Sequence, residues 1–98
     1  MAGKGLRSVD FEVFGKVQGV FFRKHTRINA GKHSLVGWVM NTQHNTVVGQ
    51  LQGDTGKVSL MKRWLKETGS PKSRIDRCEF KNERTITKLE FSDFTIRK

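Results

Sequence analysis

Segments with strand periodicity and segments with helix periodicity alternate along this chain in an order that few folds can accommodate. Val9, Phe11 and Val13 alternate with polar residues, a period of two that predicts a half-buried strand. The predicted elements are, in order, a strand around 9–13, a helix from about 22 to 33, strands at 35–40 and 46–51, a helix from about 55 to 68, a strand around 75–80 and a short strand at 94–97. Two interleaved strand–helix–strand units predict an α+β, ferredoxin-like βαββαβ sandwich, with two helices on one face of an antiparallel sheet and an extra C-terminal strand.

The second predicted helix has the clearest boundaries. Asp54 or Thr55 is expected to cap its N-terminus, and Gly69 and Pro71 are expected to end it. The strand that follows has an irregular pattern of apolar residues, which favours a bulge.

The length and cysteine content of the chain limit its organisation. Its 98 residues predict a single domain over 1–98 with one modest core. Cys78 is the single cysteine and cannot form an internal disulfide, so we expect a packed thiol and a reducing compartment. No apolar run has the length of a signal core or a membrane span, so the sequence predicts a cytoplasmic protein with no membrane partner, and we expect a monomer.

The charge of the chain favours anionic partners. Nineteen Lys and Arg residues against nine Asp and Glu residues give a formal net charge of +10, which attracts phosphates, carboxylates and nucleic acids alike. The basic residues are spread from Arg7 to Lys98, so a solvated surface that steers a small anion suffices to explain them. RNA-recognition modules with this fold place aromatic residues on a central strand, and the stretch 46–52 has none, so specific nucleic-acid binding is not expected.

The stretch from Gly15 to Arg23 is the strongest candidate for an anion site. Gly15 and Gly19 permit positive φ angles and close backbone approach, so successive N–H groups can converge on one anion. Arg23 adds a planar fork that matches two phosphate oxygens, and the predicted helix begins at this point, where its dipole favours negative charge. The glycine spacing alone is weak, because such a pair occurs about once by chance in a chain with 10 Gly.

Other catalytic constellations are missing from the sequence. His25, His33 and His44 have neither the spacing of a metal-binding helix face nor a nearby Cys pair. No Walker loop is present, and no carboxylate cluster beside the anion site indicates Mg²⁺, so no metal or cofactor is expected. Asp10 and Glu12 alternate with the apolar residues of their strand and are expected on its solvated face, not as a catalytic pair.

Asn41 closes the second predicted strand, where its amide can reach past the edge of the sheet. Asparagine is common at strand ends because its side chain mimics a backbone turn, and the residues alone favour that interpretation.

Four segments of the chain form a specific combination. They read GKVQGVFFR at 15–23, LVGWVMN at 35–41, VVGQLQG at 47–53 and GSPKSRID at 69–76. In this order they resemble the acylphosphatase family, and the resemblance runs from about Val9 to Arg97. Ser34 and Asp54 stand where that family usually has glycine and proline, and Asn45 lies where glycine is common; asparagine is the next best residue for a left-handed backbone.

The resemblance implies an enzyme that hydrolyses acyl phosphates to a carboxylate and inorganic phosphate, the latter acting also as a competitive inhibitor. It implies that Arg23 holds the phosphate and that Asn41 orients the attacking water. The implied phosphate-binding residues are Gly15, Lys16, Val17, Gln18, Gly19, Val20 and Arg23.

The chemistry is compatible with so small a set of residues. The leaving carboxylate has a conjugate acid with a pKa of about 4, so it departs at neutral pH without a proton donor. Phosphoryl transfer is largely dissociative, so positioning and charge stabilisation supply most of the catalysis. Two alternatives remain: a basic nucleic-acid-binding module, and a domain that binds acyl phosphates or carbamoyl phosphate as a sensor without useful turnover.

Overall fold

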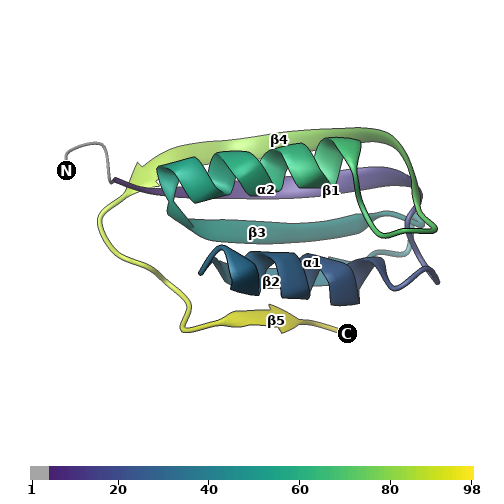
Figure 1. Cartoon of the computed structure of the whole chain (residues 1–98), viewed down its shortest axis with the longest axis horizontal. Helices are drawn as coiled ribbons and strands as arrows, with labels where there is room; N and C mark the ends of the chain where they lie inside the picture. Colours follow the sequence, from purple (N-terminus) through teal and green to yellow (C-terminus); the bar gives the residue numbers. More distant parts are fainter. Residues whose placement is uncertain (1–4) are drawn as a thin grey trace.

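The computed structural model describes residues 5–98 and contains the elements in the predicted order (Figure 1). The elements are β1 (Leu6–Lys16), α1 (Phe22–Lys32), β2 (Val36–Asn41), β3 (Val47–Asp54), α2 (Thr55–Glu67), β4 (Arg74–Ile86) and β5 (Phe94–Ile96). Neither helix of this part of the chain is long and apolar enough to cross a membrane.

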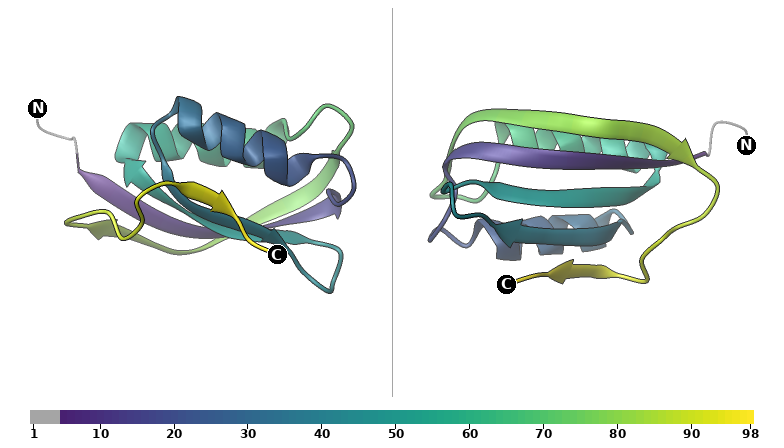
Figure 2. Two further views of the ribbon diagram at one scale, coloured as in Figure 1. Left: turned by 90° about the horizontal axis from the view of Figure 1, so that it is seen from below. Right: turned by 180° about the vertical axis from the view of Figure 1, so that it is seen from behind.

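One five-stranded sheet forms the base of the molecule. Its strand order is β4-β1-β3-β2-β5, and the first four strands pair antiparallel. Both helices lie on one face and the other face is open (Figure 2), which confirms the predicted ferredoxin-like sandwich. The short last strand pairs in parallel with β2, so the complete sheet is mixed. The predicted bulge is present, because the β1–β4 register shifts between Ser8 and Asp10 and again between Phe14 and Gly15.

The core lies between the sheet and the helices. Val9, Phe11 and Val13 are buried on the helix-covered face of β1, as their alternation predicts. Each such apolar side chain stabilises the fold by about 1.5–3 kcal/mol when fully buried. Asp10 and Glu12 lie on the open face, where they accept hydrogen bonds from Asn82 Nδ2 and Thr46 Oγ1. Their placement on the open face agrees with their alternation in the sequence.

The two helices pack through the residues that their spacing indicates. Phe22, Thr26 and Ala30 are the buried residues of α1, at intervals of four. The N-cap of α2 is Asp54, whose side chain accepts a hydrogen bond from the Lys57 N–H at 3.2 Å. Of the two predicted caps, Asp54 is therefore the one used, and the departure from proline at this position keeps the helix start satisfied.

The two residues that stand where the resembled family commonly has glycine both have left-handed backbones. Asn45 has φ 65°, as expected for the turn between β2 and β3, and Ser34 has φ 56° just after α1. The Ser34 N–H donates to the Gly31 carbonyl and the Leu35 N–H to the Ala30 carbonyl. This is a Schellman motif whose left-handed position, normally glycine, is occupied by a residue with a Cβ atom.

Replacing Ser34 by glycine should raise the free energy of unfolding by about 1 kcal/mol, because the left-handed backbone costs a residue with a Cβ atom about 1–2 kcal/mol. The urea midpoint measures the change. Ser34→Ala is the matched control, since alanine keeps the backbone strain and should bring no gain. An equal gain in both variants would show that the serine hydroxyl, not the backbone, limits stability.

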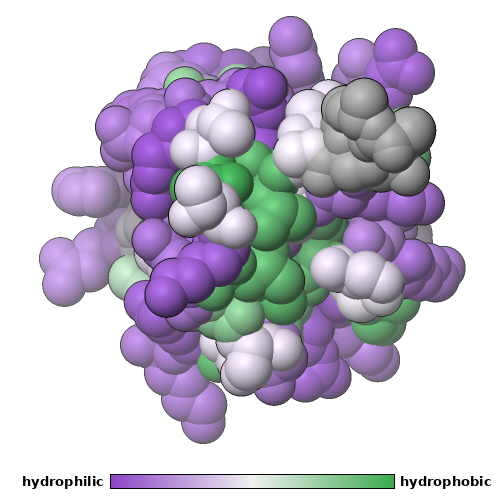
Figure 3. All heavy atoms as spheres, turned by 90° about the vertical axis from the view of Figure 1, so that its left-hand side faces the viewer, coloured by the Kyte–Doolittle hydropathy of each residue, from purple (hydrophilic) through white to green (hydrophobic). Residues whose placement is uncertain are grey.

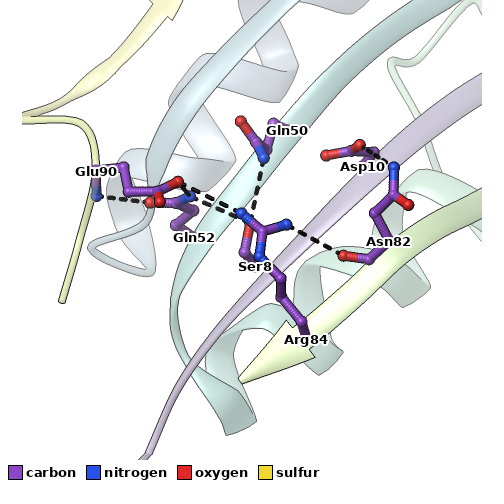
Figure 4. A network of polar contacts seen from close by, with 7 residues as sticks. All are labelled: Ser8, Asp10, Gln50, Gln52, Asn82, Arg84 and Glu90. Carbon is purple, nitrogen blue, oxygen red and sulfur yellow. Dashed lines mark hydrogen bonds and ion pairs between the residues drawn. The ribbon is translucent and has the colours of Figure 1, made fainter. Parts of the chain in front are cut away.

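Polar side chains fasten the β4–β5 connection to the open face of the sheet (Figure 4). Gln52 is fully buried and donates from Nε2 to Glu90 Oε1 at 2.7 Å and to Ser8 Oγ at 3.1 Å, while its Oε1 accepts from the Glu90 N–H at 2.8 Å. Arg84 Nη2 lies 3.5 Å from the same Glu90 oxygen. The pair of bonds between Gln52 and Glu90 therefore fixes the segment that leads into β5.

Replacing Glu90 by alanine should lower the free energy of unfolding by about 1–2 kcal/mol, because the buried Gln52 amide loses a hydrogen-bond acceptor. Chemical denaturation checks this value. Glu67→Ala, at an exposed carboxylate that makes no ion pair within residues 5–98, should change stability by less than about 0.5 kcal/mol. If Glu90→Ala and Glu67→Ala have the same free energy of unfolding, the Gln52–Glu90 contact does not stabilise the fold.

The two ends of the sheet differ. The end where β1 begins shows apolar surface surrounded by hydrophilic residues (Figure 3). At the opposite end the β1–α1 loop, the start of α1, the end of β2 and the C-terminal end of β5 come together (Figure 1).

Candidate functional site

A cavity of about 380 Å³ opens at the end of the sheet where β2 and β5 finish. Its lining residues are Val17, Gly19, Phe21, Phe22, Arg23, Lys24, Asn41, Ile96 and Lys98. The fold thus brings Arg23, from the first turn of α1, into the same cavity as Asn41, the last residue of β2.

The backbone at the start of α1 has features that favour an anion. Gly19 has φ 74° and Phe21, the N-cap residue of the helix, has φ 59°. Among residues 5–98 no side chain caps the helix, and its first turn contains no acidic residue. The first N–H groups of a helix have no partner within the helix and carry its positive dipole end. An anion in this cavity is therefore a suitable partner for them.

The guanidinium of Arg23 has no ion-pair partner within residues 5–98. Nor does it make a side-chain hydrogen bond within this part of the chain, whereas Arg7, Arg74, Arg77 and Arg84 each pair with a carboxylate. Arg23 is half-buried, so its charge is less screened than that of a fully exposed arginine. It can present both donors of its fork to an oxyanion.

Gln18 positions the loop through contacts outside the cavity. Its Nε2 donates to the Thr42 carbonyl at 3.0 Å and to the Thr46 carbonyl at 2.9 Å, which ties the loop to the β2–β3 turn. Val17 is buried beside it in the core. The loop is therefore held by one polar and one apolar anchor.

The other predicted phosphate-binding residues take different places. Gly15 and Lys16 are the last residues of β1 and pair with Ile75 and Arg74 of β4. A Cβ atom on Gly15 would lie 2.1 Å from the Arg74 carbonyl oxygen, so the close approach of the two strands requires glycine. Val20 packs against the core and lines a neighbouring groove. Of the predicted set, Val17, Gly19 and Arg23 line the cavity, and Gly15, Lys16, Gln18 and Val20 do not.

Asn41 has an unusual environment for a turn residue. Its Oδ1 is buried and has no hydrogen-bond partner within the described residues. The hydroxyl of Thr42 instead accepts the turn's bonds, from the His44 N–H at 3.1 Å and the Thr46 N–H at 3.3 Å. A buried acceptor without a partner costs about 1–3 kcal/mol. Because Asn41 also lines the cavity, its amide lies beside space that a ligand or a water molecule can occupy.

Comparison with known proteins identifies the family. A model of the acylphosphatase family matches residues 9–96. This chain belongs to the acylphosphatase family. Acylphosphatase-2 of Mus musculus is 62% identical over 92 residues, which cover 94% of this chain and 87% of that protein. Acylphosphatase-1 of Homo sapiens is 59% identical over 96 residues, which cover 98% and 97%.

A solved structure agrees with this assignment. The acylphosphatase from Coxiella burnetii superposes with a TM-score of 0.84 at 32% identity, covering 99% of this chain and 100% of that one. The fold, the family and the enzyme class expected from the sequence, an acylphosphatase hydrolase, are therefore confirmed.

The cavity of this acylphosphatase also contains residues that sequence analysis did not identify. They are Phe21, Phe22, Lys24, Ile96 and Lys98. Lys24 could have been identified from the sequence, because it directly follows Arg23 at the start of a predicted helix. No local sequence pattern points to Ile96 or Lys98, because they reach the site only through the parallel pairing of β5 with β2.

Cys78 is not a nucleophile candidate in this acylphosphatase. Burial raises the pKa of the Cys78 thiol to about 12, so the thiol stays protonated and unreactive at neutral pH. Within residues 5–98, no group of three His, Cys, Asp or Glu side chains is placed to hold a metal ion.

Proposed function

We propose that this protein hydrolyses the carboxyl–phosphate bond of acyl phosphates in the cavity at the start of α1. Arg23 and the backbone N–H groups of the stretch from Val17 to the start of α1 bind the phosphoryl group, and Asn41 orients the attacking water. The observation that supports this most directly is the cavity that Arg23 and Asn41 share beside a helix start without a side-chain cap. Within residues 5–98 the Arg23 guanidinium makes no ion pair and the buried Oδ1 of Asn41 has no hydrogen-bond partner.

The chemistry asks for little beyond these groups. In a loose transition state the negative charge is spread over three phosphoryl oxygens, and a fixed fork with converging N–H groups stabilises that charge without reorganising. The carboxylate leaves unprotonated, so no general acid is needed. The Asn41 amide cannot take up a proton at neutral pH, so it aligns the water, and the proton passes to a phosphate oxygen or to solvent.

The properties of the whole chain fit this proposal. A net charge of +10 steers anionic substrates toward the site and favours retention of inorganic phosphate, which we propose is both product and competitive inhibitor.

Aromatic rings on the open face of the sheet are covered by arginines. The Arg97 guanidinium lies 4.4 Å from the centre of the Trp38 ring, and the Arg77 guanidinium lies 3.8 Å from the centre of the Phe14 ring. We propose no specific nucleic-acid partner, and a single domain over 1–98 that acts as a cytoplasmic monomer.

Incubation with benzoyl phosphate in excess EDTA should release inorganic phosphate at a rate far above spontaneous hydrolysis. Added phosphate should inhibit competitively, because it occupies the same fork and N–H groups. Loss of activity in EDTA that returns with a divalent cation would contradict the metal-independent mechanism. Binding of phosphate with no turnover of benzoyl phosphate would instead support a sensor for acyl phosphates.

A further inference from the structure

Phe21 combines two features that are unfavourable for a phenylalanine. Its side chain is 72% exposed, and its backbone is left-handed with φ 59°. A left-handed backbone costs a residue with a Cβ atom free energy that glycine or asparagine would largely avoid, and an exposed ring gains little from burial. Strain of this kind is concentrated at sites that bind ligands.

Phe21 lines two hollows. One is the cavity that contains Arg23 and Asn41, and the other is a groove of about 360 Å³. The groove is lined by Gly19, Val20, Phe21, His25, Pro71 and Lys72. The Lys24 ammonium lies 5.9 Å from the centre of the ring, and Lys24 lines the cavity and not the groove. The groove therefore combines the Phe21 residue with one lysine, Lys72.

The geometry of phosphoryl transfer says where the acyl group must lie. The attacking and leaving oxygens are in line on opposite sides of the phosphorus atom. Asn41, which positions the attacking water, lines the cavity and not the groove. The leaving carboxylate therefore points away from Asn41, and Phe21 is a residue that lines both the Asn41 cavity and the groove.

We propose that the ring of Phe21 is the contact surface for the acyl group and that it favours aromatic acyl phosphates over small aliphatic ones. This inference rests on the proposed function. An aromatic acyl group can stack on the ring from the groove side, whereas an acetyl group is too small to cover it.

The test compares kcat/KM for benzoyl phosphate and acetyl phosphate in the wild type and in Phe21→Asn. Asparagine tolerates the left-handed backbone, so the loop keeps its shape while the ring is lost. In Phe21→Asn, the ratio of kcat/KM for benzoyl phosphate to kcat/KM for acetyl phosphate should fall by about two- to tenfold, the range expected for one aromatic contact. Differences in leaving-group pKa cancel, because they are the same in both proteins.

Two further variants separate a substrate contact from a structural role. Phe21→Trp keeps an aromatic surface and should keep the preference for benzoyl phosphate. Leu60→Asn removes another exposed apolar side chain, on α2 and outside both hollows, and should leave the ratio unchanged. A loop that is merely distorted lowers both kcat/KM values together and raises the Ki of inorganic phosphate, leaving the ratio at its wild-type value.

The outcomes of this experiment are distinct from those of the proposed function. If the wild type hydrolyses neither compound, the proposed function is wrong. If the wild type hydrolyses both compounds and Phe21→Asn keeps the wild-type ratio of the two kcat/KM values, the proposed function is supported and the role of Phe21 is refuted.

Discussion

Replacement of Arg23 by alanine should lower kcat/KM for benzoyl phosphate by a factor of about 10²–10³ or more and abolish inhibition by inorganic phosphate. The fork of Arg23 is proposed to bind the phosphoryl oxygens in both the ground state and the transition state, so the loss affects binding and rate together. Steady-state kinetics with phosphate as inhibitor measure both quantities. Because Arg23 makes no ion pair within residues 5–98, its removal breaks no protein contact of that kind, and the fold should remain.

Lysine at position 23 should not restore the activity. Its ammonium is a point charge and cannot reproduce the two parallel bonds of a guanidinium to an oxyanion. Arg63→Ala is the matched control, since Arg63 is an exposed arginine of α2 and does not line the cavity. Near-normal kcat/KM in Arg23→Lys would rule out the bidentate contact.

Replacement of Asn41 by alanine should lower kcat by a factor of about 10²–10³, while the Ki of inorganic phosphate changes only a few-fold. The amide is proposed to align the nucleophile, an interaction that belongs to the transition state and not to the bound phosphate. Stability should be unchanged or slightly higher, because the substitution removes a buried oxygen that has no partner within the described residues. Aspartate at this position should weaken phosphate binding, since it places a negative charge beside a dianion.

Thr42→Val provides the comparison for a role in the turn. Thr42 accepts the hydrogen bonds of the β2–β3 turn, so its loss should cost about 1 kcal/mol of stability with little change in rate per folded molecule. If Asn41→Ala behaves like Thr42→Val, with a lower urea midpoint and near-wild-type kcat, then Asn41 is a turn residue and has no part in the mechanism.

Structural features that depend on residues close together in the sequence could be predicted, whereas features that depend on pairing between distant strands could not. The spacing of Phe22, Thr26 and Ala30 and the cap at Asp54 are local properties, and the structure confirms them. Glycine is typical of loops, so the sequence suggests a loop position for Gly15. In the structure Gly15 lies inside β1, where pairing with β4 brings a carbonyl close to it, and this pairing cannot be deduced from the local sequence.

The contribution of β5 to the cavity also depends on pairing between distant strands and could not be predicted. The alternation at 94–97 predicts a strand, yet no local pattern says that this strand runs parallel to β2 and brings Ile96 to the cavity. The left-handed backbone of Phe21 was also beyond prediction, because intrinsic preference is against it and the tertiary structure overrides that preference.

The unpartnered oxygen of Asn41 has a consequence for any selection applied to this protein. A screen for heat resistance alone should replace Asn41 with apolar residues, since such variants lose a buried polar atom that the fold leaves unsatisfied. A screen for phosphate release should restore asparagine at the same position. Under the proposed mechanism, the two selections would diverge most sharply at this residue.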